Sequence, residues 1–248
     1  MSTTHVASML IRRTADTMLV FVDYEHADGR TSEYGERIQA ARTWITYRLE
    51  DLSGMPCHLV RYDRISQSLL DRLDARAIFI SGNSISPSAY DPAAVEPIHT
   101  ILRETPLPVF GFCGGFQLLA HALGSAVISL APRPEDAEDE SMVITGDGST
   151  FEFGYHPIDL APGSASHPLL TGVGDHAVFR HAHGLHVSAP PDGFATLAST
   201  SATPIQMAVH AERKIVGTQF HPEYWTDEHS AGKTMIANFL NWAGIQIP

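Results

Sequence analysis

Residues 108–124 read PVFGFCGGFQLLAHALG: a short apolar run, a cysteine between glycines, and then apolar residues at helical spacing. This pattern predicts a strand, a sharp turn at Cys113, and a helix. Gly111 and Gly115 stand two residues before and two after the cysteine, which is the spacing of a nucleophile elbow. Such a turn places the sulfur at a helix N-terminus, where the helix dipole favours the thiolate. A small buried hydrophobic cysteine fits the same five residues, so the stretch alone leaves both interpretations open.

The residues before this stretch alternate between apolar runs and helical patterns. The predicted strands are MLVFVD (18–23), CHLVRYD (57–63), AIFISG (77–82) and LPVFGF (107–112), and the predicted helices cover residues 34–52, 69–73, 93–103 and 115–123. Strands that alternate with helices in this way predict an α/β fold with a mostly parallel central sheet flanked by helices on both faces.

The pattern changes after the predicted elbow helix. Residues 131–150 are polar and acidic, which predicts a solvated loop, with its charge run at 135–140 as a solvated face. Short β-like segments then follow, and residues 229–244 form an amphipathic closing helix. No linker rich in Pro, Gly or Ser divides the chain. The organisation expected is an N-terminal extension (residues 1–17) and a single domain (residues 18–248).

The composition of the 248-residue chain excludes some classes of function. Its formal net charge of −12 argues against a nucleic-acid partner, because binding to phosphate backbones depends on clustered Lys and Arg. No apolar run is long enough to span a bilayer, and the N-terminus lacks the order of a secretory signal. A cytoplasmic protein is expected, with Cys57 and Cys113 reduced and unpaired.

A base and an orienting acid for Cys113 are found in GTQFHPEYW (217–225). KIVGTQF (214–220) is a predicted strand, so His221 follows its carboxyl end. The carboxyl ends of parallel strands gather at one edge of a sheet, where Cys113 also lies. Glu223 is placed to accept a hydrogen bond from the imidazole and fix its tautomer. The sequence therefore predicts a Cys113–His221–Glu223 triad.

GFCGGFQLLA together with GTQFHPE resembles the class I, or triad, glutamine amidotransferases. FEFGYHPIDL (151–160), HPLLTG (167–172), AHGLHV (182–187), the segment at 191–223 and GKTMIANFL (232–240) resemble, in the same order, the glutaminase part of GMP synthetase. The resemblance covers residues 18–242. It implies a flavodoxin-like amidotransferase fold with extra short strands.

The resemblance implies a mechanism for the triad. Cys113 would attack the side-chain carboxamide of L-glutamine, and His221, oriented by Glu223, would pass the thiol proton to the departing ammonia. Water would then release glutamate from the thioester. No cofactor is implied.

Further roles follow from the same resemblance. The oxyanion would be held by the backbone amide of Gly114 and by one at Gly82 or Asn83. Gln117 matches the family's glutamine-binding position, and His183 matches a histidine near the substrate pocket. His183 fits a structural role in its loop equally well.

The chain also departs from the family pattern. SGNSISPSAY (81–90) stands where the family usually has two glycines and a proline, and Leu185 stands where the GMP synthetase type has an acid. Residues 24–37 are expected to form an additional loop. These mixed signatures assign no biosynthetic subfamily.

Three functions remain open on the sequence. The leading hypothesis is a glutaminase subunit that supplies ammonia to a separate synthetase, since no phosphate-binding loop is present. The second is a γ-glutamyl hydrolase, and the third is a catalytically silent binding module on the same fold. No metal site is expected: His181 and His183 share one face of a predicted strand, but the sequence places no cysteine or carboxylate beside them.

Overall fold

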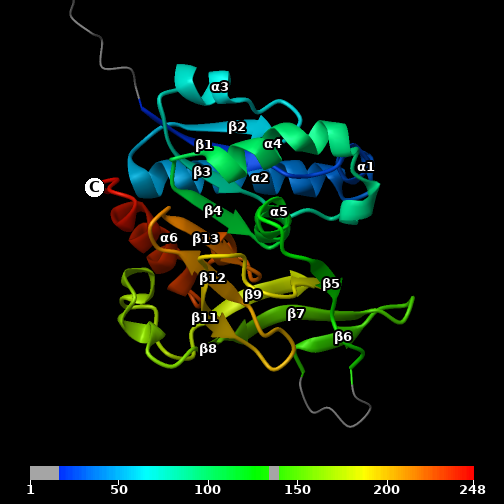
Figure 1. Ribbon diagram of the computed structural model, residues 1–248. Coiled ribbons are helices and arrows are strands. Elements are labelled where there is room, and N and C mark those ends of the chain that lie inside the picture. Colours follow the sequence, from blue (N-terminus) through cyan, green and yellow to red (C-terminus); the bar gives the residue numbers. More distant parts are fainter. Residues whose placement is uncertain (1–16, 134–139) are drawn as a thin grey trace, which may run out of the picture.

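The computed structural model describes residues 17–133 and 140–248 of the chain (Figure 1). The strands are β1 (Met18–Asp23), β2 (Cys57–Arg61), β3 (Ala75–Ile80), β4 (Val109–Phe112), β5 (Val127–Ser129), β6 (Met142–Ile144), β7 (Thr150–Pro157), β8 (Asp159–Leu160), β9 (Val178–His183), β10 (Leu185–Val187), β11 (Ala195–Ser199), β12 (Met207–His210) and β13 (Ile215–Thr218). The helices are α1 (Ala27–Thr31), α2 (Gly35–Ser53), α3 (Gln67–Arg72), α4 (Pro92–Glu104), α5 (Gly114–Ala122) and α6 (Ala231–Trp242), with short 3₁₀ turns η1 (Pro87–Ala89), η2 (Ser164–Ser166), η3 (Pro168–Leu170) and η4 (Pro222–Tyr224).

The central sheet has eight strands in the order β2-β1-β3-β4-β13-β12-β11-β8. The pairs from β2 through β13 are parallel, and β12, β11 and β8 continue the sheet antiparallel. β3, β4 and β13 are neighbours, so the segments that follow them meet at one edge of the sheet. The predicted mostly parallel α/β fold is confirmed.

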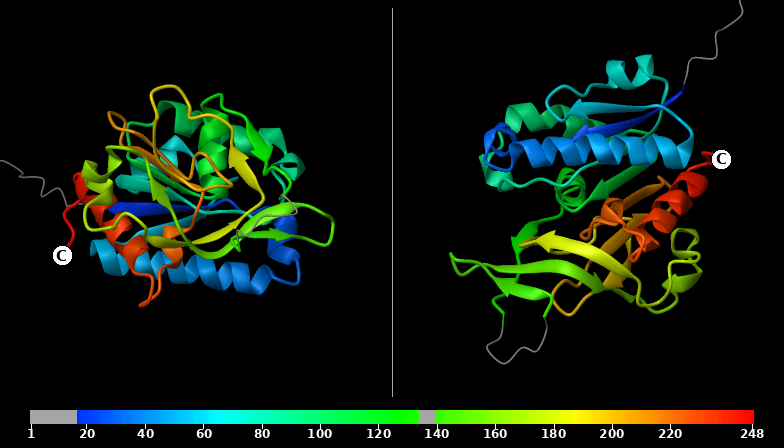
Figure 2. Two further views of the ribbon diagram at one scale, coloured as in Figure 1. Left: turned by 90° about the horizontal axis from the view of Figure 1, so that it is seen from below. Right: turned by 180° about the vertical axis from the view of Figure 1, so that it is seen from behind.

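Successive side chains of each strand point to opposite faces of the sheet. Both faces therefore carry apolar side chains, and helices cover both. Leu19 and Phe21 of β1 enter the core that α2 and α6 cover, whereas Val20 and Val22 enter the core that α4 and α5 cover. Figure 2 shows α2 and α6 together on one side of the sheet. The ends of α2 agree with the sequence: Gly54 has φ 68° and stops the helix in a left-handed turn.

A second sheet, β6-β7-β9, lies beside the antiparallel end of the main sheet, and β5 pairs with β10 (Figure 1). β9 connects this sheet to the main one, since His221 N–H donates to Arg180 O over 2.8 Å. A strand of the second sheet is thereby placed against the segment that follows β13.

Two of the predicted loops are wrong in part. β6 lies within the loop predicted at residues 131–150, because its backbone pairs with β7. The sequence did not predict β5 either. α1 lies within residues 24–37, where the His26 ring accepts the Asp28 N–H at the start of the helix. Residues 1–16 of the predicted extension and residues 134–139 of the acidic run lie outside the described part of the chain. In the described part, no helix is long and apolar enough to cross a membrane.

Candidate active site

Cys113 occupies the turn between β4 and α5 in a strained backbone conformation, with φ 49° and ψ −107°. The flanking glycines are required by close packing around this turn. A Cβ on Gly111 would lie 2.7 Å from the carbonyl carbon of Gly115, and one on Gly115 would lie 2.5 Å from Ile80 O. Cys113 is therefore held at the N-terminus of α5 by a turn that only these small neighbours permit.

His221 and Glu223 reach the cysteine from the chain after β13. Glu223 lies in η4, is 1% exposed, and its Oε1 lies 2.7 Å from His221 Nδ1. Cys113 lies beside the same imidazole, since a Cβ on Gly82 would lie 3.0 Å from His221 Cε1 and 3.6 Å from Cys113 Cβ. The structure thus brings the three predicted side chains together in the order thiol, imidazole, carboxylate.

The charge of His221 is set by these neighbours. Burial disfavours the imidazolium, but the Glu223 carboxylate and Cys113 outweigh that effect and raise the pKa of His221 to about 10. An imidazolium beside the sulfur stabilises a thiolate, which is the nucleophilic form of cysteine.

Gln219 is a neighbour of the thiol that the sequence did not single out. Its side chain is fully buried, and its Nε2 donates to Cys113 Sγ over 3.5 Å. GTQFHPE contains this residue, but strand alternation alone does not say that it turns toward the elbow. The donated hydrogen bond favours negative charge on the sulfur.

The three residues predicted to hold the oxyanion lie together beside the triad. A Cβ on Gly82 would lie 3.0 Å from His221 Cε1 and 3.6 Å from Cys113 Cβ, and one on Gly114 would lie 3.0 Å from Asn83 N. The backbone amides of Asn83 and Gly114 therefore border the same small space next to the sulfur.

A cavity of about 360 Å³ opens in front of Cys113, and its lining includes Gln117 and His183. Gln117 is fixed there because its Nε2 donates to Leu185 O over 2.9 Å. The β6–β7 turn contributes Asp147 to Phe151 to the opposite wall. Both predicted substrate-binding side chains therefore line the space that the thiol faces.

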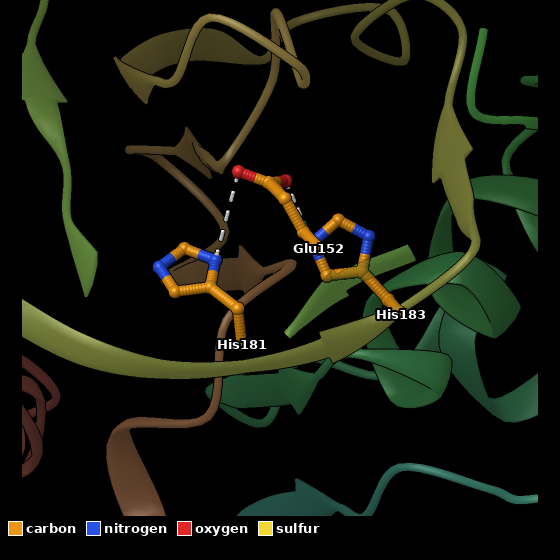
Figure 3. A group of neighbouring side chains, drawn as sticks. All are labelled: Glu152, His181 and His183. Atoms are coloured by element: carbon orange, nitrogen blue, oxygen red, sulfur yellow. Dashed lines mark ion pairs between the residues drawn. The ribbon is translucent and has the colours of Figure 1, made fainter. Parts of the chain in front are cut away.

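A buried carboxylate lies beside His181 and His183, so the prediction that none does is wrong (Figure 3). Glu152 of β7 stands directly opposite His183 of β9 in the antiparallel ladder. Its Oε2 lies 3.0 Å from His183 Nε2, and its Oε1 lies 4.0 Å from His181 Nδ1. The pairing of β7 with β9 brings Glu152 beside the two histidines. The sequence around the histidines alone (residues 176–187) does not reveal this neighbour.

These three side chains form the candidate metal-ligating group found among residues 17–133 and 140–248. The carboxylate already accepts hydrogen bonds from Thr200, Thr203 and Gln206, over 2.6 to 2.8 Å. With both carboxylate oxygens hydrogen-bonded, the arrangement favours a buried ion pair over an open set of metal ligands.

The His183 ring contacts an acceptor at each nitrogen. Nε2 faces the Glu152 carboxylate, and Nδ1 lies 3.2 Å from Leu185 O. Leu185 O is also the acceptor for Gln117, so Glu152 is linked through His183 to the cavity wall.

Comparison with known proteins identifies the family. The family model "Glutamine amidotransferase class-I" matches residues 39–242. The chain is 30% identical over 205 residues to a GMP synthase [glutamine-hydrolyzing] of Pseudoalteromonas atlantica, covering 79% of this chain and 34% of that protein. It is 32% identical over 196 residues to the enzyme of the same name from Thermomicrobium roseum, covering 79% and 32%. The chain thus spans about a third of the length of these curated relatives.

Solved structures show the same fold. A protein described as a GMP synthase subunit, from Thermoplasma acidophilum, superposes with a TM-score of 0.65 at 21% identity, covering 92% of this chain and 94% of that one. A glutamine amidotransferase from Thermotoga maritima gives a TM-score of 0.61 at 12% identity, covering 92% and 98%. Together with the family model, these similarities show that the chain belongs to the class I glutamine amidotransferases.

Proposed function

We propose that this chain hydrolyses L-glutamine to glutamate and ammonia through Cys113, His221 and Glu223. The observation that carries the proposal is the meeting of a strained cysteine elbow, which lines a cavity, with a buried His–Glu pair. Family membership supports the same chemistry.

The reaction begins with the thiolate of Cys113, which attacks the carboxamide carbon of glutamine. The tetrahedral oxyanion accepts hydrogen bonds from backbone amides at Gly114 and at the 82–83 loop. The imidazolium of His221 donates its proton to the departing amide nitrogen, and ammonia leaves. A thioester between Cys113 and the γ-glutamyl group remains.

Hydrolysis of the thioester completes the cycle. His221, now neutral, takes a proton from water, which attacks the acyl carbon, and glutamate is released. Glu223 holds the imidazole in the tautomer that keeps Nε2 facing the sulfur. Gln117 and His183 shape the cavity that would receive the amino-acid end of the substrate.

The ammonia is delivered to a separate acceptor enzyme. The relatives support this step, because they are named as glutamine-hydrolysing synthases. The class of acceptor that fits best is a synthetase.

Glutamate release by the isolated chain tests the proposal. L-glutamine and a bulkier γ-glutamyl amide are each supplied to the wild-type chain and to Cys113→Ala. We expect cysteine-dependent release from glutamine and much slower release from the bulkier amide. Faster cleavage of the bulkier amide would make the chain a γ-glutamyl hydrolase, and cleavage by Cys113→Ala would overturn the assigned nucleophile.

A further inference from the structure

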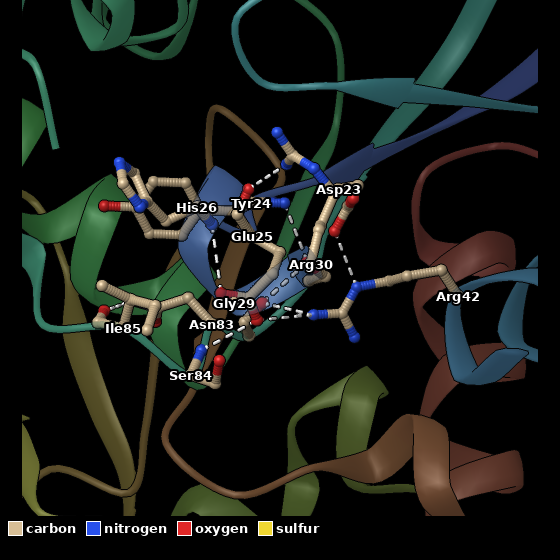
Figure 4. Close-up of polar contacts among 12 residues, drawn as sticks. Asp23, Tyr24, Glu25, His26, Gly29, Arg30, Arg42, Asn83, Ser84 and Ile85 are labelled. Atoms are coloured by element: carbon tan, nitrogen blue, oxygen red, sulfur yellow. Dashed lines mark hydrogen bonds and ion pairs between the residues drawn. The ribbon is translucent and has the colours of Figure 1, made fainter. Parts of the chain in front are cut away.

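The loop that follows β3 is held by a buried arginine from a different part of the chain. Arg42 of α2 is 6% exposed, and its Nη2 donates to Gly82 O over 2.8 Å. Its Nε donates to Asp23 Oδ1 over 2.9 Å at the end of β1 (Figure 4). One rigid guanidinium therefore joins the carboxyl end of β1 to the loop beside the triad.

This contact fixes the direction of the peptide between residues 82 and 83. Gly82 O accepts a second hydrogen bond from Ser81 Oγ over 2.8 Å, so the carbonyl is held by two donors. The peptide is trans, hence the N–H of Asn83 points away from that carbonyl. The nitrogen itself lies next to the elbow, since a Cβ on Gly114 would lie 3.0 Å from Asn83 N.

The Asn83 N–H is free to receive a ligand. Within residues 17–133 and 140–248, no acceptor for it is present. The Asn83 Nδ2 donates to Ile85 O over 2.6 Å, and its Oδ1 lies against Gly114. The backbone amide therefore remains as the donor that this residue offers to the cavity beside Cys113.

A second anchor holds the next residue of the same loop. The Ser84 N–H donates to Glu25 Oε2 over 2.9 Å, and Glu25 is 1% exposed. Glu25 Oε2 also lies 3.9 Å from Arg42 Nη2. Gly29 of α1 packs directly on the Glu25 carboxylate, which leaves that side chain little room to move.

Resting on the proposed function, we propose that Arg42 and Glu25 are positioning residues that set the oxyanion-binding amide of Asn83 before substrate arrives. Arg42 orients the peptide through its carbonyl, and Glu25 holds the loop on its other side. The segment at 24–37, additional to the family pattern, thus gives the loop at 81–84 the rigidity that its own residues do not provide.

The test compares glutamine hydrolysis with a reaction of the same thiol that forms no oxyanion. Iodoacetamide alkylates Cys113 by direct displacement, so its rate reports the thiolate and the triad but not the amide of Asn83. The first variant is Arg42→Lys, which keeps a positive charge beside Asp23 but loses the simultaneous contact with Asp23 and Gly82 O. The second variant is Glu25→Ala. The control is Arg37→Lys, an exposed arginine on the same helix.

Loss of one oxyanion donor lowers kcat about 10²–10³-fold, so we expect Arg42→Lys to lower kcat at least about tenfold, with KM changed less than about threefold. Glu25→Ala should lower kcat in the same direction, and both variants should keep the wild-type alkylation rate. Arg37→Lys should match the wild type in both reactions. If Arg42→Lys does not fold, Glu25→Ala carries the test.

Two results overturn the inference. In one, both variants hydrolyse glutamine as fast as the wild type. In the other, alkylation slows as much as hydrolysis, which places the effect on the triad or the fold. A wild-type chain that alkylates normally but does not hydrolyse glutamine would instead contradict the proposed function, so the two failures are distinct.

Discussion

Cys113 holds a backbone conformation that residues with a Cβ rarely adopt, and the surrounding packing maintains it. This strained turn lifts the sulfur out of the sheet toward the cavity. Replacing Cys113 by glycine removes the Cβ and should relieve the backbone strain, and it also removes the nucleophile.

We therefore predict that Cys113→Gly has a higher free energy of unfolding than Cys113→Ala by about 1 kcal/mol, the strain relieved less the greater freedom of glycine in the unfolded chain. Urea unfolding of the two variants measures the difference. Neither variant should hydrolyse glutamine. A Cys113→Ala variant more stable than Cys113→Gly would show that the elbow is not strained.

The carboxylate of Glu223 should control the charge of His221. In Glu223→Gln burial is no longer opposed by that carboxylate, so the pKa of His221 should fall from about 10 by at least about 1 unit, and kcat should fall about 10²-fold or more. NMR titration of labelled histidine measures the shift. Glu228→Gln, an exposed change on the same segment, is the matched control.

The sign of the linked effect on stability follows from the same shift. Because the folded pKa of His221 is raised, its protonation contributes stability that is complete below its ordinary pKa of 6.5 and lost as the pH rises through about 10. If His221 titrates in Glu223→Gln with the same pKa as in the wild type, the assigned pairing of His221 with Glu223 is wrong.

At the scale of elements, the pairing of β7 with β9 places Glu152 beside His183. Burial disfavours the charge of Glu152, but the hydrogen bond and charge of His183, together with His181, outweigh it and lower its pKa to about 2. Burial lowers the pKa of His181 to about 4. Glu152 is therefore a carboxylate at pH 7, and His181 is neutral.

Glu152→Gln should destabilise the fold at pH 7 by about 3 kcal/mol, since it removes the buried charge that accepts hydrogen bonds from Thr200, Thr203 and Gln206. Because the folded pKa is lowered, the contribution of Glu152 is complete above its ordinary pKa of 4.5 and lost as the pH falls through about 2. Denaturant unfolding at pH 7 and pH 3 should show a smaller difference at pH 3. The exposed change Glu140→Gln is the control. An equal difference at both pH values would show that the charge of Glu152 does not stabilise the fold.

Elements with a strong local signal were predictable, and those that depend on pairing were not. Residues 18–22 are apolar throughout, and β1 forms over the predicted range of 18–23. β6 has three residues within a polar stretch, and only its partner β7 makes it a strand. The proximity of Glu152 to His183 has the same origin, because no local pattern specifies the register of two antiparallel strands.

At the scale of the whole molecule, the site joins segments from both ends of the chain. β1 contributes Asp23, α2 contributes Arg42, the elbow contributes Cys113, and the chain after β13 contributes His221. The cysteine and histidine were predictable because both follow parallel strands, whose carboxyl ends share one edge. Arg42 was not, because a buried arginine inside an amphipathic helix is indistinguishable in sequence from an exposed one.

The most direct test of the account is covalent labelling of Cys113 by a chloroketone analogue of glutamine, located by mass spectrometry of peptides from the full chain. We expect one label per chain, on Cys113, formed at a rate that L-glutamine lowers and absent in Cys113→Ala. Exposed thiol reactivity alone would give labelling that glutamine does not slow. Labelling without protection by glutamine, or on Cys57 in place of Cys113, would contradict a glutamine-hydrolysing site at this elbow.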